Sequence, residues 1–249
     1  MEIQIEALLK LTTLLFVTIL FGCGSVSHEQ VSPNFDNMAA ADARITLGLG
    51  YIEVGERSRA KENLDLALKY APDYFRAHRA LAYYYQIIGD IKTSIQFYQQ
   101  ALRSLPNNGD VLNDFAVLLC KYERYKEAEL YFAKAFTQKD YYLVSVSYEN
   151  AAFCLLKGGD KQTAERYFER SLAHDPNRYR SLLQLSKLKI EVDQLSKARV
   201  LLLRYKQRYG YDPVSLKLFI ELENKAGNTQ QVVHYGEVLA SQFSKPALN

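Results

Sequence analysis

A spacing of 34 residues recurs along most of this chain. Each unit opens with a large apolar residue followed by a small one, and the second half of each unit carries its own small and large residues at fixed distances. The opening pairs are Leu47-Gly48, Leu81-Ala82, Phe115-Ala116, Ala151-Ala152 and Leu185-Ser186, with two extra residues between the third and fourth. A period of this length predicts an array of helix pairs, because one pair cannot bury its apolar face alone.

The residue types within the frame indicate how each pair would pack. Small residues fit where two helices cross closely, and a large residue four positions later fills the space beside them. Gly55, Gly89 and Gly159 fall where a left-handed residue would end the first helix of a pair. The small residues of the second helix are Ala60, Ala128, Ala164 and Ala198, the large ones are Leu64, Tyr98, Phe132, Phe168 and Leu202, and prolines close units at Pro72, Pro106 and Pro176.

This frame is typical of tetratricopeptide repeats. The sequence therefore predicts an all-α solenoid of about six helix pairs forming a right-handed superhelix over residues 38–249. The sixth unit is degenerate, as expected of a terminal cap. The expected repeats span residues 41–74, 75–108, 109–142, 145–178, 179–212 and 213–247.

Charge and motif content exclude several classes of function. The 31 Lys and Arg residues nearly balance the 28 Asp and Glu residues and are interspersed with them, which argues against nucleic acid as a partner. The densest basic stretch, Arg199 to Arg208 with Arg204 and Lys206 between, is interpreted as a solvated helix face. The four histidines (His28, His78, His174 and His234) have no partner at zinc-site spacing, and phosphate-binding and nucleophile-elbow motifs are missing. We expect no enzyme activity, cofactor, metal or small-molecule substrate.

The amino terminus predicts export. Residues 11–21 are apolar, which is the length of a signal-peptide core and too short for a membrane span. The stretch Leu20-Phe21-Gly22-Cys23 resembles the lipobox of bacterial lipoproteins, although an ordinary signal with a chance cysteine is the alternative. The resemblance implies a cleaved signal peptide over residues 1–22, a lipid-modified Cys23, and a tether over residues 23–37. Gly24, where an Asp would retain the protein at the inner membrane, implies anchoring at the outer membrane, facing the periplasm.

Two further cysteines fall within the array. Cys120 and Cys154 lie near the ends of the first helices of repeats three and four, which should be neighbours. In the oxidising periplasm they would form a disulfide between those repeats; otherwise they are small core hydrophobes.

The first helices of such arrays line a binding surface. In this frame the lining positions of repeats one to three are predicted to hold a groove that binds protein. An apolar groove of this kind marks a partner site, unless the amino-terminal segment folds back and covers it. The predicted groove residues are Ile45, Leu49, Ile52, Arg76, Arg79, Tyr83 and Asn113, followed by Ile87, Val117, Glu149 and Phe153 further along the same helices.

Repeats three and four carry a more specific resemblance. Asn107-Asn108-Gly109-Asp110 with Leu112-Asn113, then Leu119-Cys120, and Glu149-Asn150-Ala151 with Cys154 resemble the type IV pilus biogenesis/stability lipoprotein family, PilF/PilW. The sequence departs from that family at Phe115-Ala116, at Ala152, and at Glu123, which replaces a turn glycine. The resemblance covers essentially the whole chain. It implies an outer-membrane pilotin that binds the type IV pilus secretin and promotes its localisation and assembly into a ring.

Two other functions are compatible with a repeat lipoprotein. One is a scaffold in the assembly of β-barrel outer-membrane proteins, whose repeats typically run longer than 34 residues and have other signatures. The other is a regulator of cell-wall synthesis. The fold alone does not separate them, because this architecture hosts many partners.

Overall fold

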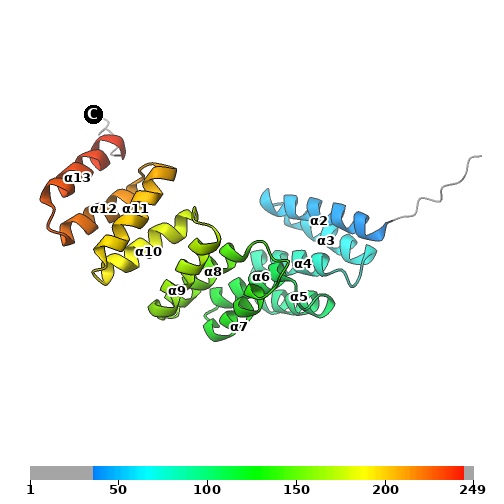
Figure 1. Ribbon diagram of the computed structural model, residues 1–249. Helices are drawn as coiled ribbons and strands as arrows, with labels where there is room; N and C mark the ends of the chain where they lie inside the picture. The colour runs from blue at the N-terminus through cyan, green and yellow to red at the C-terminus, as the bar shows by residue number, and fades with distance from the viewer. Residues whose placement is uncertain (1–35, 244–249) are drawn as a thin grey trace, which may run out of the picture. The chain divides into compact units, whose positions relative to one another are not determined.

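A computed structural model describes residues 36–243 of the chain. The predicted signal peptide, Cys23 and nearly all of the predicted tether lie outside the described residues. Within the described range the structure is helical throughout, with twelve helices in six consecutive pairs (Figure 1). The pairs are α2 (Asn37–Glu53) with α3 (Arg57–Tyr70), α4 (Phe75–Ile88) with α5 (Ile91–Ser104), α6 (Gly109–Lys121) with α7 (Tyr125–Phe136), α8 (Val144–Lys157) with α9 (Lys161–His174), α10 (Tyr179–Glu191) with α11 (Leu195–Tyr209), and α12 (Pro213–Lys225) with α13 (Thr229–Phe243).

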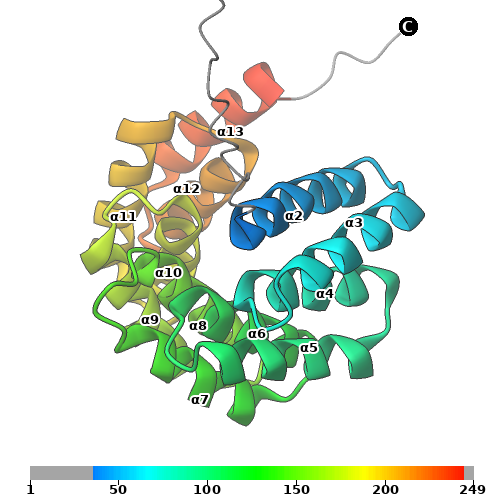
Figure 2. The same ribbon diagram turned by 90° about the vertical axis from the view of Figure 1, so that its right-hand side faces the viewer.

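Each pair packs on the next in chain order. Helix α4 contacts α5 and α3, α8 contacts α9 and α7, and the same pattern continues to α12 and α13. Within the array, α4, α6 and α8 follow one another along one face and α5, α7 and α9 along the other (Figure 2). We call these the first-helix face and the second-helix face. The prediction of an all-α repeat solenoid is confirmed.

The helices of a pair approach closely at the small residues of the frame. A Cβ atom added to Gly48 would lie 2.6 Å from Cδ2 of Leu64, so a larger residue there would push the two helices apart. Ala82, Ala116 and Ala152 are fully buried at the matching positions. Tyr98, Phe132 and Phe168, the large residues predicted to fill the space beside them, are also buried. Close packing at one repeated point therefore builds every pair in the same way.

The turns inside the pairs need a residue in the left-handed region. Gly55, Gly89 and Gly159 have φ values of 80°, 86° and 88°. In repeats three and five the same turn is made by Glu123 (φ 62°) and Asp193 (φ 58°), whose Cβ atoms make this conformation unfavourable. These two turns store local strain that the packed helices on either side maintain.

We expect Glu123→Gly to stabilise the protein by about 0.5–1 kcal/mol, since relief of the left-handed strain exceeds the added freedom of the unfolded chain. Urea unfolding would measure the free energy of unfolding. The matched control is Gly89→Ala, which introduces the same strain in repeat two and should lower stability by about 1 kcal/mol. A destabilised Glu123→Gly variant would contradict this account of the turn.

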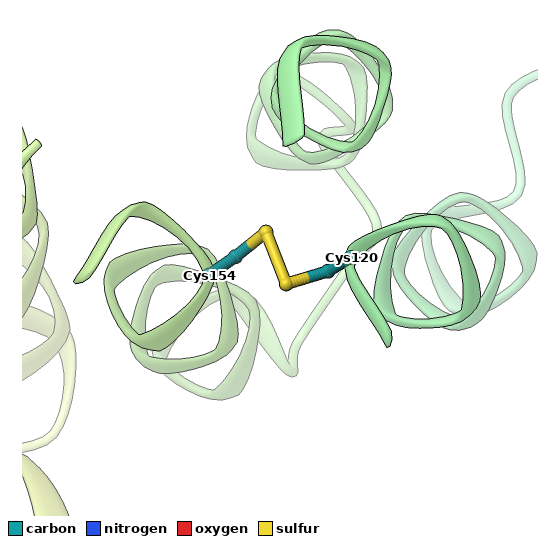
Figure 3. Close-up of a disulfide and its surroundings, with 2 residues drawn as sticks. All are labelled: Cys120 and Cys154. Atoms are coloured by element: carbon teal, nitrogen blue, oxygen red, sulfur yellow. A yellow bond between two sulfur atoms is a disulfide. The ribbon is translucent and has the colours of Figure 1, made fainter. Parts of the chain in front are cut away.

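A disulfide joins the third and fourth repeats in the structure. Cys120 near the end of α6 and Cys154 on α8 are both buried, with Cα atoms 5.7 Å apart (Figure 3). That separation lies within the normal range for a disulfide. The bond closes a loop of 34 residues that includes α7 and the longer connection between the two repeats.

We predict that these cysteines are oxidised in the exported protein. Closing a loop of this length restricts the unfolded chain by about 3–4 kcal/mol, so Cys120→Ser combined with Cys154→Ser should lower the free energy of unfolding by an amount of that order. The oxidation state can be read by alkylating the unfolded, unreduced protein and measuring its mass. Modification of both thiols in that sample would refute the disulfide.

Candidate functional site: a groove across the first two repeats

One wall of the groove comes from α2. Ile45, Leu49 and Glu53 follow one another at intervals of four residues, which places them on one side of the helix. Ile45 is buried, Leu49 is half-buried and Glu53 is exposed. This wall therefore passes from an apolar floor to an acidic end.

The opposite wall comes from α4. Arg76, Arg79, Ala80 and Tyr83 share one face of that helix at the helical intervals of three and four residues. Ala80 is buried, whereas 41% of the surface of Tyr83 is exposed. With the α2 residues and Asp114 they enclose a hollow of about 330 Å³. The small Ala80 side chain leaves room between the ring of Tyr83 and the aliphatic side chains of α2.

Both arginines of the groove are held by carboxylates of the protein itself. Nε of Arg79 donates to Oδ2 of Asp114 on α6 at 2.7 Å, and Nη1 of Arg76 lies 3.1 Å from Oδ1 of Asp42 on α2. Burial disfavours the charged form of Arg79, but the charge of Asp114 and its hydrogen bond outweigh burial and hold the pKa of Arg79 above its ordinary value. Glu53 has no ion-pair partner among the described residues. The groove thus offers apolar surface and one free carboxylate.

The structure brings together five of the seven predicted groove residues. Ile45, Leu49, Arg76, Arg79 and Tyr83 all line the hollow. The other two lie elsewhere, as do the lining residues predicted further along the chain. Ile52 packs against the core of repeats one and two, Asn113 is buried between repeats three and four, Glu149 is buried against repeat five, and Val117 and Phe153 line a smaller hollow over the disulfide.

Asn113 and Glu149 share a function that sequence reasoning missed. Oδ1 of Asn113 accepts hydrogen bonds from Ser147 at 2.8 Å and from Asn150 at 3.2 Å. Glu149 accepts from Arg178 at 2.5 Å and from the hydroxyl of Ser181 at 2.7 Å. Each side chain therefore holds the following repeat, and neither is free for a partner.

Three groove residues were not predicted: Glu53, Ala80 and Asp114. Glu53 and Ala80 could have been found from helical spacing, since each lies four residues beyond a predicted groove residue on its own helix. Asp114 could not, because its place in the groove depends on how α6 stacks on α4.

Other kinds of site receive no support from the described residues. Between residues 36 and 243, the acidic, histidine and cysteine side chains form no group of three or more that could hold a metal ion. None of the helices described over the same residues combines the length and apolar character needed to cross a membrane. The groove is therefore the feature of the first-helix face that best fits a binding role.

Known proteins share both the sequence and the fold. No family model matches the chain. The chain is 32% identical over 197 residues to the type IV pilus assembly protein PilF of Pseudomonas aeruginosa, covering 79% of this chain and 78% of PilF. It is also 32% identical over 145 residues to an uncharacterised protein of Haemophilus influenzae, covering 58% of this chain and 79% of that protein.

Solved structures agree with these sequence matches. The structure of Pseudomonas aeruginosa PilF matches with a TM-score of 0.73 at 30% identity, over 83% of this chain and 93% of PilF. The structure of PilW, a type IV pilus biogenesis factor, matches with a TM-score of 0.69 at 25% identity, over 82% of this chain and 93% of PilW. A tetratricopeptide-repeat protein of Parabacteroides merdae matches at 14% identity with a TM-score of 0.61, over 84% of this chain and 82% of that protein, which supports the fold alone. The resemblance seen in the sequence is confirmed, and the chain belongs to the PilF family of tetratricopeptide-repeat proteins.

Proposed function

We propose that this chain is a pilotin: an outer-membrane lipoprotein, anchored through Cys23 and facing the periplasm, that binds the secretin subunit of the type IV pilus machine. Binding would promote localisation of the secretin and its multimerisation, and so pilus biogenesis and twitching motility. Membership of the PilF family supports a role in type IV pilus biogenesis. The role is one of binding and involves no catalysis.

The groove of repeats one and two is the observation that carries this proposal. Its apolar surface comes from Leu49 and Tyr83 above a floor of Ile45, and its arginines are already neutralised. A partner segment would therefore insert large apolar side chains, and a basic residue near Glu53 would add charge complementarity. The free end of an unassembled secretin subunit is a suitable source, because such a segment becomes accessible before the ring closes.

A lipid anchor at Cys23 would supply the second requirement, delivery to the membrane. Each methylene buried in a bilayer contributes about 0.8 kcal/mol, so several acyl chains hold a protein there stably. Recognition by the groove and attachment at Cys23 are separate physical functions, and each can be removed without the other.

We expect Leu49→Glu and Tyr83→Glu to abolish secretin binding, because each places a buried charge against the partner's apolar side chains. Both positions are partly exposed, so the fold should tolerate the change. The measurement is recovery of secretin from detergent-solubilised envelope with the lipidated protein as bait, together with the ratio of secretin ring to monomer in cells. We expect at least a tenfold loss of bound secretin, or about 1.4 kcal/mol.

The control for these variants is Leu130→Glu, an exposed leucine on α7 of the second-helix face, which should leave assembly unchanged. Normal secretin rings in cells that carry both groove variants would rule out the groove as the binding site. Recovery of barrel-assembly proteins or cell-wall enzymes without secretin would replace the proposed function with one of the two alternatives.

We expect Cys23→Ser to release the protein from the outer membrane while leaving its affinity for secretin unchanged. Membrane fractionation would measure the first effect and binding of purified protein would measure the second. Secretin should then form fewer rings in the outer membrane, as it does with the groove variants, although the purified proteins still bind. Retention of the Cys23→Ser protein in the outer membrane fraction would exclude the lipid anchor.

A further inference from the structure

One position of the repeat frame is aromatic in four repeats and leucine in one. Phe97, Tyr131, Tyr167 and Tyr235 occupy it in repeats two, three, four and six. In repeat five the same position is Leu201, which lies 34 residues after Tyr167 and 34 before Tyr235.

The rings at this position fill the space beside their neighbouring helices. Tyr167 packs edge-on against Phe136 of the preceding repeat, with ring centroids 5.4 Å apart, and against Tyr148 at 5.6 Å. Tyr235 stacks on Phe219 at 4.7 Å. Because protein interiors are close-packed, a smaller residue at this position leaves space that another group must fill.

In repeat five that space is open. The positions equivalent to Phe136 and Tyr148 are Leu172 and Leu182, so all three rings that meet between repeats three and four are leucines between repeats four and five. The result is a hollow of about 520 Å³ between α9, α10 and α11, helices that lie next to one another in Figure 1. Its apolar lining is Leu172, Ala173, Leu185, Val200 and Leu201.

The rim of this hollow is positively charged. Helix α11 carries five basic residues and no acidic one. Two of the five, Lys197 and Arg204, line the hollow, are exposed, and form no ion pair within the described residues. At the base, Lys189 is buried and lies 2.6 Å from Glu165 and 2.9 Å from Glu169, so its charge is balanced. The charges that remain available to a ligand are those of Lys197 and Arg204.

We propose that this hollow is a second binding site, which takes a protein segment that inserts an aromatic side chain and places carboxylates against Lys197 and Arg204. The partner's ring would occupy the space that the chain's own ring fills in repeats two, three, four and six. A concave slot suits an inserted side chain better than the flat surface of a bilayer. The site goes beyond the pilotin proposal, since it lies on other helices than the groove.

The absence of tryptophan from the chain allows a direct test. The probe is the peptide acetyl-Asp-Glu-Trp-Glu-Asp-amide, whose indole fluorescence can be excited without exciting tyrosine. We expect a saturable blue shift and a rise in anisotropy when the full chain is added. Leu201→Tyr restores the ring of the other repeats, so it should weaken peptide binding at least tenfold while leaving the melting temperature unchanged or higher.

Charge variants test the rim without changing the apolar lining. Lys197→Glu combined with Arg204→Glu should weaken the peptide at least tenfold, whereas Arg208→Glu, on the same helix but outside the hollow, should not. If Leu201→Tyr fails to fold, this pair of variants decides the question. Failure of the peptide to bind, equal binding of acetyl-Lys-Lys-Trp-Lys-Lys-amide, or equal binding by Leu201→Tyr and the charge variant would overturn the proposal.

The occupant and the groove can be tested separately. Concentration-dependent dimerisation of the wild-type chain that Leu201→Tyr abolishes would identify the occupant as a second copy and overturn the proposed partner; a monomer at all concentrations supports it. Secretin recovery should be the same for Leu201→Tyr and wild type. A loss of secretin with Leu201→Tyr would overturn the independence of the two sites, whereas a failed groove experiment leaves the peptide result standing.

Discussion

The close crossing of two helices at paired small residues is the contact on which the rest of this structure depends. Gly48 against Leu64 shows how little room there is, since even one methyl group on Gly48 would clash. Because the same crossing recurs in every pair, each pair presents its remaining side chains at fixed positions. The stacking of repeats, and with it every hollow on either face, follows from that fixed presentation.

Contacts between repeats use a polar position next to this crossing. Arg79 binds Asp114, Asn113 accepts from Ser147, and Glu149 is held by Arg178 of the following repeat. Buried polar groups need such partners, and a directional hydrogen bond fixes the orientation of one repeat on the next more narrowly than apolar contact does. Side chains at this position are therefore committed within the protein, although in a helical projection they look like parts of a binding surface.

This explains what could be predicted from the sequence. The period, the turn glycines and the crossing residues follow local rules, so the fold was accessible from the sequence alone. Five groove residues were accessible too, because helical spacing determines the face on which each side chain lies. The roles of Asn113 and Asp114 were not, since adjacent residues on α6 point about 100° apart and only the stacking of α6 on α4 decides which one reaches the groove.

Both binding regions arise where one repeat departs from the others at a shared position. Ile45 occupies in repeat one the position held by Arg79, Asn113 and Glu149 in the next three repeats, and its apolar side chain forms the floor of the groove. Leu201 does the same at the aromatic position and leaves the hollow beside α11. A regular array satisfies its own packing and polar groups at every step. An exception to the frame therefore leaves either apolar surface or open space, and in this chain the two exceptions lie on different faces and select different chemistry.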